Sequence, residues 1–203
     1  MNLQRVRRQR GSGFAFFLGF LRRPHLVGSV IPSSRFLERR LVNVADIAKA
    51  RLVVELGPGT GGTTRAILDT LSEESKLLAI EINPKFASLL GYDPDPRLIV
   101  HLGSAEYIPE ALAIYGLSRP DAVVSGIPFS TMPFALGQRI LSAVWSCLAP
   151  GGRFVAYQFR RQVVLLGREL LGTPEIEVEL LNVPPVRVYH WRKPADGEQM
   201  EAG

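Results

Sequence analysis

Residues 51–62 read Arg51-Leu-Val-Val-Glu-Leu-Gly-Pro-Gly-Thr-Gly-Gly62, and this stretch decides the fold. Its apolar start is typical of a buried strand, its glycines are typical of a tight turn, and a helical pattern follows over residues 64–71. Glycines let such a loop turn sharply and approach a ligand closely, and the start of the helix adds unpaired backbone N–H groups. Strand, glycine loop and helix in this order predict a nucleotide-type binding loop.

Two classes of cofactor compete for this loop. Residues 57–62 match the G-x-G-x-x-G fingerprint of dinucleotide sites, whereas residues 55–61 match the E-x-G-x-G-x-G pattern of S-adenosylmethionine methyltransferases. Glu55 favours the second class, because a carboxylate beside the loop attracts a cationic amino-acid group and opposes a pyrophosphate. Pro58 also removes an N–H group that a phosphate would use. We therefore expect S-adenosylmethionine, with a dinucleotide or no cofactor as the alternatives.

Strands and helices alternate along the rest of the chain. Residues 76–81 form a second expected strand, and its last residue, Glu81, can accept hydrogen bonds from the ribose hydroxyls of either cofactor. Further strands are expected over residues 97–102, 121–125, 153–159, 175–181 and 186–191, and further helices over residues 35–48, 105–115, 134–148 and 161–171. The last two strands are close enough in sequence to form a hairpin. The pattern predicts an α/β fold with a mostly parallel, doubly wound, seven-stranded sheet and a C-terminal antiparallel hairpin.

The positive charge of the chain is concentrated at its N-terminus. The 203 residues have a net charge of +5, but residues 1–40 hold nine arginines and one acid, whereas residues 41–203 hold 15 basic and 18 acidic side chains. A basic arm on a near-neutral body indicates a polyanion or an anionic membrane as its partner. One cysteine excludes a disulfide framework, and the three histidines are too widely separated to suggest a metal site, so no metal is expected.

An apolar segment within the arm is flanked by arginines. Phe14–Leu21 is far shorter than the roughly 20 residues of a membrane-spanning helix, and no signal-peptide cleavage site follows it. As a helix over residues 12–23, it would carry phenylalanines and leucines on one face and arginines at its ends, which is typical of an interfacial helix on anionic lipid. A helix packed against the body is the alternative.

These features divide the chain into three parts. We expect residues 1–33 to form a basic amphipathic membrane-binding arm and connector, residues 34–193 a methyltransferase domain, and residues 194–203 a disordered tail. The expected location is cytoplasmic and peripheral, on the inner face of the cytoplasmic membrane. Nothing in the sequence indicates an oligomeric state.

Four segments carry a resemblance to a known family: Phe17–Arg23 with Gly28–Ser34, Val54–Gly61, Ala79–Asn83 and Ser125–Ser130. The chain resembles class I methyltransferases over roughly residues 12–192. Within them it is similar to bacterial cytoplasmic phospholipid N-methyltransferases, which methylate phosphatidylethanolamine towards phosphatidylcholine. The resemblance implies N-methylation of a phosphatidylethanolamine headgroup at the membrane surface, with S-adenosylhomocysteine as the second product.

Ribosomal RNA adenine dimethyltransferases are similar to this lipid family and provide the alternative function. They carry an Asn or Asp, followed by Pro-Pro or Ile-Pro and an aromatic residue, after the fourth strand. The polar side chain accepts a hydrogen bond from the adenine amino group, and the aromatic ring stacks on the base. Here Ser125-Gly126-Ile127-Pro128-Phe129 keeps the Ile-Pro-aromatic part but lacks that polar anchor. RNA adenine methylation and a non-catalytic membrane protein that binds the cofactor remain the alternatives.

The resemblance and the strand order imply a set of cofactor contacts at the carboxyl ends of the strands. Residues of the glycine loop would surround the methionine part, Glu81 the ribose, and the residues after the third strand the adenine. The expected cofactor-binding residues are Ser33, Ser34, Glu55, Gly57, Pro58, Gly59, Thr60, Gly61, Glu81, Ile82, Ser104, Ala105, Glu106, Ser125 and Gly126.

The substrate is expected beside the ends of the fourth, fifth and last strands. The expected substrate-binding residues are Ile127, Pro128, Phe129, Arg160 and Arg187, of which an arginine would bind the lipid phosphate. Tyr157, Tyr189 and His190 are the catalytic candidates, as contacts of the amine or as relays of its proton. The alternative reading is a core Tyr189, a surface His190 and solvated arginines.

Overall fold

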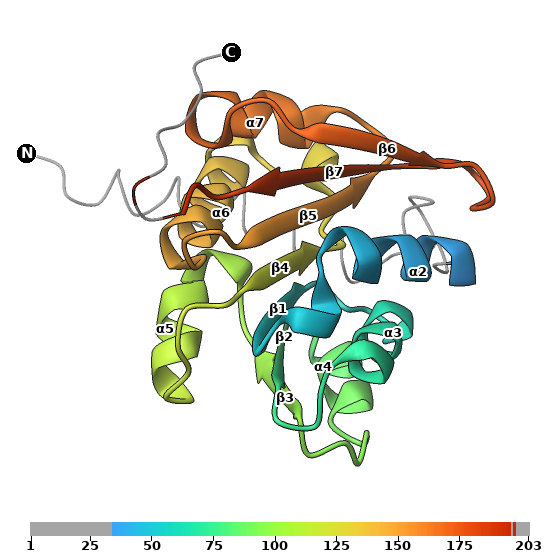
Figure 1. Cartoon of the computed structure of the whole chain (residues 1–203), viewed down its shortest axis with the longest axis vertical. Coiled ribbons are helices and arrows are strands. Elements are labelled where there is room, and N and C mark those ends of the chain that lie inside the picture. The colour runs from blue at the N-terminus through green and yellow to red at the C-terminus, as the bar shows by residue number, and fades with distance from the viewer. Residues whose placement is uncertain (1–33, 196, 198–203) are drawn as a thin grey trace, which may run out of the picture.

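A seven-stranded sheet forms the centre of the structure, a computed structural model that describes residues 34–195 and 197 (Figure 1). The strands are β1 (Leu52–Leu56), β2 (Lys76–Glu81), β3 (Leu98–Leu102), β4 (Ala122–Ser125), β5 (Arg153–Gln158), β6 (Glu175–Glu179) and β7 (Val186–Arg192). Their order is β3-β2-β1-β4-β5-β7-β6, and the first five are parallel. The predicted fold class and sheet are confirmed.

The C-terminal strands form the predicted antiparallel hairpin. β7 pairs antiparallel with both β5 and β6, so the last strand lies inside the sheet and β6 forms its edge. Because β6 is antiparallel to β7, it runs parallel to β5 and ends at the same edge of the sheet. That shared edge also holds the carboxyl ends of β1 and β4.

Helices cover both faces of the sheet. They are α2 (Arg35–Val44), α3 (Gly62–Thr70), α4 (Pro84–Leu90), α5 (Ile108–Ile114), α6 (Phe134–Cys147) and α7 (Gln162–Leu171). α2 and α3 share one hydrophobic core with the sheet, and α5, α6 and α7 share the other. In the described part of the chain, short 3-10 helices lie at Ile47–Lys49, Ala105–Tyr107 and Phe129–Thr131.

Two helices differ from the sequence-based expectation. The helix predicted over residues 35–48 ends at Val44, because Asp46 takes a left-handed conformation with φ 52° and a separate turn follows. α4 was not predicted, although Asn83-Pro84 is a helix start: the Asn83 side chain accepts a hydrogen bond from the Lys85 N–H group, and Pro84 occupies the first turn.

The direction in which successive strands are added to the sheet reverses between β1 and β4. The chain steps outward from β1 to β2 and β3, and then crosses back to β4 on the other side of β1. Ligands of such sheets bind outside the carboxyl ends of the strands at this reversal.

No helix among residues 34–195 is long and apolar enough to cross a membrane. The predicted arm of residues 1–33 and most of the predicted tail lie outside the described residues.

Candidate active site

The glycine loop follows β1 and closes against its neighbours on two sides. A Cβ atom on Gly57 would lie 3.1 Å from the Ile127 side chain, and one on Gly61 would lie 2.8 Å from the Leu90 side chain. Gly59, between them, has φ 58°, and a Cβ atom there would meet nothing within 4 Å. The loop is therefore packed at both ends and open at its centre, where its backbone is accessible to a ligand.

Glu55 lies buried beneath this loop, with 1% of its surface exposed. The Thr64 hydroxyl donates a hydrogen bond of 2.6 Å to its Oε2, whereas its Oε1 has no hydrogen-bond partner among the described residues. Burial raises the pKa of Glu55 to about 8, the negative charge of Glu81 adds to this rise, and the Thr64 bond opposes it. A buried carboxylate oxygen without a partner fits a cationic ligand group.

Glu81 ends β2 and connects it to the glycine loop. Its carboxylate accepts hydrogen bonds from the Gly59 N–H group at 3.1 Å and from the Asn83 N–H group at 2.7 Å. Burial raises the pKa of Glu81, and the backbone hydrogen bonds oppose that rise. Two buried carboxylates therefore lie at the carboxyl ends of β1 and β2. When ionised, these carboxylates favour the cationic S-adenosylmethionine over a pyrophosphate, so the residues present fit that cofactor.

The residues expected around the adenine lie after β2 and β3. Ile82 is partly buried against the core. Ser104 is mostly buried, and its hydroxyl accepts a hydrogen bond from the Glu106 N–H group, while Ala105 is buried beneath it. The Glu106 carboxylate accepts a hydrogen bond of 2.8 Å from Arg139 on α6. This ion pair ties the segment to α6, and its role in adenine binding remains a prediction.

Tyr157 and Gly126 are in close contact at the ends of β5 and β4. A Cβ atom on Gly126 would collide with the Tyr157 hydroxyl and would lie 2.9 Å from its Cζ and 3.1 Å from the Gly57 carbonyl oxygen. The Thr63 hydroxyl lies 3.5 Å from the same phenol oxygen. Only glycine at position 126 leaves room for this arrangement, which places the phenol beside the glycine loop.

The segment after β4 turns its apolar side chains inward. Ile127 and Phe129 are buried, with Phe129 1% exposed in the core shared with α5, α6 and α7, whereas Pro128 is partly exposed. Ser125 is buried and accepts a weak hydrogen bond from the Ile127 N–H group at 3.4 Å. Gln158 donates a bond of 2.6 Å to the Ile127 carbonyl oxygen and so fixes the segment to β5.

The structure does not bring the three catalytic candidates together. Tyr157 and His190 lie on the face that α2 covers, but His190 pairs with Val155, two residues further from the carboxyl edge, and lies 3.9 Å from Glu175 and from Glu177. Tyr189 lies on the opposite face, fully buried, with a hydroxyl that has no partner among the described residues. Of the three, Tyr157 adjoins the glycine loop.

The expected phosphate ligands lie at the rim of the same edge. Arg160 is exposed in the loop after β5, and Arg187 is exposed at the start of β7, where it donates a hydrogen bond to the Phe159 carbonyl oxygen. Ser33 lies outside the described residues. The Ser34 hydroxyl accepts a hydrogen bond of 3.2 Å from the Leu37 N–H group and so caps α2.

Two groups near the site were not predicted from the sequence. Glu38 on α2 places a carboxylate oxygen 2.9 Å from where a Cβ atom on Gly62 would lie, and burial raises its pKa. Gln158 holds the segment after β4, as described above. Glu38 lies in the first turn of a predicted helix, but no local pattern indicates which part of the fold that helix meets.

Comparison with known proteins gives a relative that matches most of the chain. An ornithine lipid N-methyltransferase of Singulisphaera acidiphila is 34% identical over 187 residues, which cover 88% of this chain and 95% of the relative. Ribosomal RNA small subunit methyltransferase A of Phenylobacterium zucineum is 33% identical over 96 residues, 46% of this chain and 32% of that protein. No family model matches.

Solved structures support the fold. The O-methyltransferase from Bacillus cereus in complex with SAH superimposes with a TM-score of 0.66 at 13% identity, over 88% of this chain and 91% of that one. The loop with its buried carboxylate and the methyltransferase relatives agree on S-adenosylmethionine as the cofactor. The chain therefore belongs to the class I S-adenosylmethionine-dependent methyltransferases, in the same family as the ornithine lipid enzyme.

Proposed function

We propose that the protein transfers a methyl group from S-adenosylmethionine to the amino nitrogen of a membrane lipid headgroup. Phosphatidylethanolamine is the acceptor expected from the sequence, and ornithine lipid is the acceptor named for the relative that matches 88% of the chain. Both headgroups carry a primary amine on an anchored lipid. The proposal takes this shared chemistry as the substrate class and phosphatidylethanolamine as its first candidate.

The observation that carries the proposal is the contact of the Tyr157 hydroxyl with Gly126. An adenine enzyme needs an amide or acid side chain at the end of the fourth strand, but a side chain on Gly126 would collide with Tyr157. The polar groups at this point are therefore hydroxyls, the Tyr157 phenol and the Thr63 hydroxyl 3.5 Å from it. Hydroxyls suit one amine nitrogen better than the paired donors and acceptors of a base edge.

Phe129 supports the same choice. Base recognition requires an aromatic face that is open for stacking, but Phe129 is almost fully buried in the core. Ribosomal RNA small subunit methyltransferase A of Cutibacterium acnes matches 72% of this chain at 28% identity but is itself covered to only 51%, whereas the ornithine lipid enzyme is covered to 95%. These two facts favour the lipid amine over adenine.

The chemistry assigns a role to each group at the carboxyl ends of the strands. S-adenosylmethionine, when bound, supplies an electrophilic methyl group on a sulfonium centre. Glu55 and Glu81 would hold its ammonium group and its ribose. The Tyr157 oxygen would accept a hydrogen bond from the acceptor amine and so aim the nitrogen lone pair at the methyl carbon.

The acceptor must lose a proton before it can attack. A primary amine resembles lysine, with an ordinary pKa of about 10.4, so water at neutral pH keeps it protonated. Apolar surroundings at Ile127 would disfavour the charged form, so that the amine gives its proton to solvent water as it enters the site. After methylation the nitrogen becomes cationic, and the Tyr157 ring can stabilise it by a cation–π contact.

Methyl transfer to defined lipids tests the proposal. Labelled S-adenosylmethionine is offered with vesicles that contain phosphatidylethanolamine, ornithine lipid or neither. Tyr157→Phe is expected to lower kcat about 10-fold to 100-fold with an unchanged Kd for the cofactor, because the lost hydrogen bond contacts the acceptor. Tyr107→Phe, at an exposed tyrosine on the 3-10 turn after β3, is the matched control. Full activity of Tyr157→Phe would show that the Tyr157 hydroxyl does not bind the acceptor amine.

A further inference from the structure

The loop between β6 and β7 exposes large apolar side chains. Leu180, Leu181 and Val183 are 70%, 61% and 88% exposed, and we name these three residues the hairpin tip. Pro184 and Pro185 beside them are exposed as well. Apolar residues gathered in one exposed loop mark a contact surface for a partner or a membrane.

Hydrogen bonds hold this loop in place. The fully buried Asn182 accepts a hydrogen bond of 3.0 Å from the Ser34 N–H group and donates one of 3.0 Å to the Pro184 carbonyl oxygen. The Leu181 N–H group donates to the Glu179 carboxylate at 2.9 Å, and Arg40 on α2 binds the same carboxylate. The apolar side chains therefore point outward because the inner side of the loop is fixed by polar bonds.

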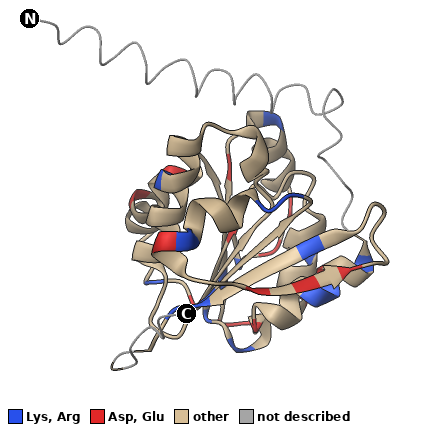
Figure 2. Ribbon diagram, turned by 90° about the horizontal axis from the view of Figure 1, so that it is seen from above, with Lys and Arg blue, Asp and Glu red and all other residues tan. Residues whose placement is uncertain are grey.

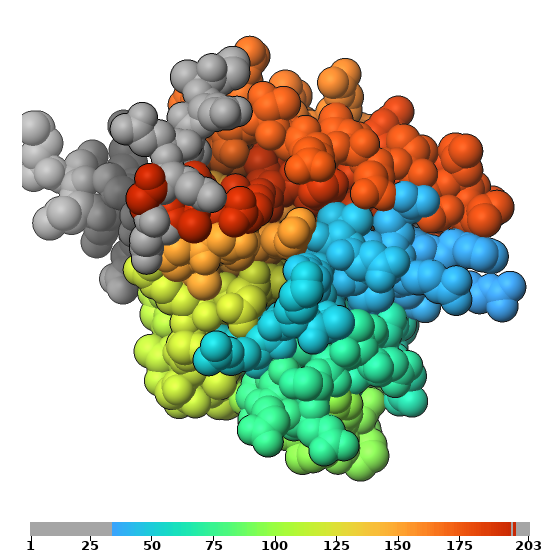
Figure 3. Space-filling view, viewed as in Figure 1, coloured from blue at the N-terminus to red at the C-terminus, as the bar shows by residue number. Residues whose placement is uncertain are grey.

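The hairpin tip lies at the edge of the sheet that carries the cofactor loop. Gln158, the last residue of β5, and Val178 of β6 both pair with Arg187 of β7, so the tip extends beyond the end of β5. Figures 1 and 3 show this hairpin projecting from the body above α2. The chain enters the described structure at Ser34, next to the hairpin. The predicted arm of residues 1–33 therefore joins the body beside the tip.

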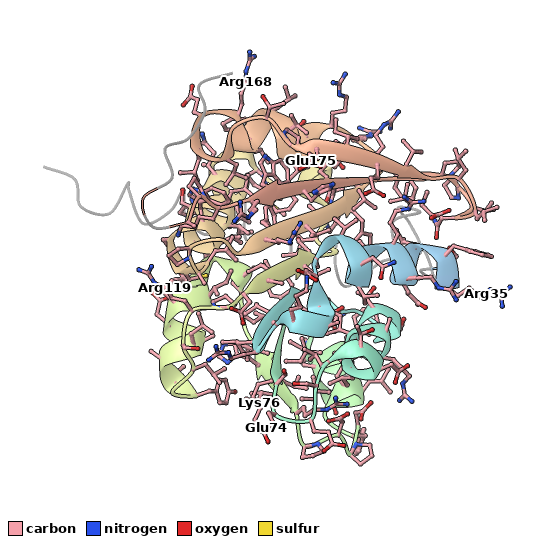
Figure 4. All side chains as sticks on the ribbon, viewed as in Figure 1. Arg35, Glu74, Lys76, Arg119, Arg168 and Glu175 are labelled. Atoms are coloured by element: carbon pink, nitrogen blue, oxygen red, sulfur yellow. The ribbon has the colours of Figure 1, made fainter. Side chains whose placement is uncertain are left out.

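Exposed arginines lie around the tip. Leu181 shares an open groove with Arg39 and Phe36 of α2, and the Arg35 guanidinium lies 5.0 Å from the centre of the Phe36 ring. Figure 4 shows Arg35 at the outer end of α2, directed away from the body, and Figure 2 shows basic and acidic residues together on the strands of the hairpin. Further exposed arginines at this edge are Arg160, Arg161 and Arg187. Apolar side chains with arginines around them complement an anionic bilayer.

We propose that the hairpin tip is a membrane contact of its own, which inserts into the interface of an anionic bilayer. It would act beside the predicted N-terminal arm and hold the carboxyl edge of the sheet, with the cofactor loop, against the headgroups. The inference rests on the proposed function, because a lipid acceptor requires that this edge meet a bilayer. The proposed occupant of the surface is the bilayer, and a second copy of the chain is an outcome that the test can detect.

An environment-sensitive fluorophore at the tip tests this contact in the full chain. Val183→Cys is labelled with a nitrobenzoxadiazole thiol reagent at neutral pH. The native Cys147 is buried, and burial raises the pKa of its thiol to about 11, so the label goes to position 183. Ile114→Cys on α5 is the matched control, since Ile114 is 68% exposed. The vesicles contain phosphatidylcholine with or without phosphatidylglycerol, neither of which offers a primary amine.

Anionic vesicles are expected to raise the emission of the label at position 183 several-fold and to leave the label at position 114 unchanged. The double variant Leu180→Ser/Val183→Ser is expected to lose about 20-fold in vesicle affinity, since two apolar side chains leave the interface. Ile114→Ser should stay within about 2-fold of the unmodified chain. Sedimentation of the protein with vesicles measures both values.

Three results would overturn the inference. One is binding of the chain to vesicles without any change at position 183, and another is full affinity of the double serine variant. The third is an emission rise that depends on protein concentration without vesicles, which would show that a second copy covers the tip. The fluorescence assay needs no methyl transfer. If the label at position 183 responds to vesicles but no lipid is methylated in the transfer assay, the result would contradict the proposed function alone. If lipids are methylated but the emission of the label at position 183 does not change with vesicles, the result would contradict this inference alone.

Discussion

Replacing Glu55 by Gln is expected to stabilise the cofactor-free protein and to weaken cofactor binding. The amide oxygen of Gln can still accept the hydrogen bond that Thr64 donates at 2.6 Å. The substitution removes the buried charge but preserves the shape of the side chain. A substitution that raises stability and lowers cofactor affinity is expected at a residue whose role is to bind a ligand rather than to pack the core.

The pKa of Glu55 sets the size of the stability effect. It is raised from 4.5 to about 8 in the folded protein. Between these values the folded state keeps a proton on Glu55 that the unfolded state has released, so rising pH favours unfolding. At 1.36 kcal/mol per pH unit, the free energy of unfolding falls by roughly 5 kcal/mol across this window. Glu55→Gln removes this pH dependence of the free energy of unfolding. The stability of the variant relative to the native chain is therefore greatest at pH 8 and above.

Urea unfolding of the cofactor-free chain at several pH values between 5 and 8 measures this difference. We expect the free energy of unfolding of Glu55→Gln, relative to that of the native chain, to rise with each pH step. At pH 8 the variant should be more stable by about 2 to 5 kcal/mol. Glu74→Gln, at an exposed position, should show no such gain. Parallel stability curves for Glu55→Gln and the native chain would refute the reasoning.

Three further predictions concern the site and the hairpin. The affinity of the native chain for S-adenosylmethionine should rise as pH increases from 6 to 8, because binding of the ammonium group requires ionised Glu55; calorimetry that gives equally steep curves for native and Glu55→Gln protein would contradict this. Gly126→Ala should lower the melting temperature by about 2 to 6 °C through its collision with Tyr157. Adding Tyr157→Phe should restore part of that loss, and a double variant no more stable than Gly126→Ala would argue against the contact. Asn182→Ala should cost about 1 to 3 kcal/mol in urea unfolding, since the buried Asn182 side chain loses its hydrogen bond from the Ser34 N–H group, and native stability of the variant would contradict this.

Buried parallel strands made the fold predictable. Their residues read as continuous apolar runs, and β1 is buried at every position, so its run and the glycines after it were recognisable without tertiary information. The hairpin was predicted, but the insertion of β7 between β5 and β6 was not, because pairing across the sheet leaves no local pattern. The helix over residues 35–48 was predicted, but which of its side chains meet the sheet was not: Leu37 and Leu41 are buried, whereas Phe36 is 37% exposed.

The site was predictable to the extent that it is local. Glu55 and Gly57 lie in one short sequence motif. In the structure Gly57 is part of the glycine loop, and Glu55 is buried beneath that loop. Tyr157 meets Gly126 from 31 positions away, so the reason for glycine at that position became visible only in the fold. The separation of Tyr189 from His190 follows from strand alternation, which puts neighbouring residues on opposite faces.

Competition between lipid and RNA acceptors in one reaction tests the central claim most directly. Labelled S-adenosylmethionine is incubated with the full chain, anionic vesicles that contain phosphatidylethanolamine and ornithine lipid, and ribosomal RNA. The lipid and RNA fractions are then separated and counted. The account predicts label on the amino nitrogen of a lipid headgroup. Label in RNA alone would contradict it and would assign the exposed arginines around the hairpin tip to nucleic acid.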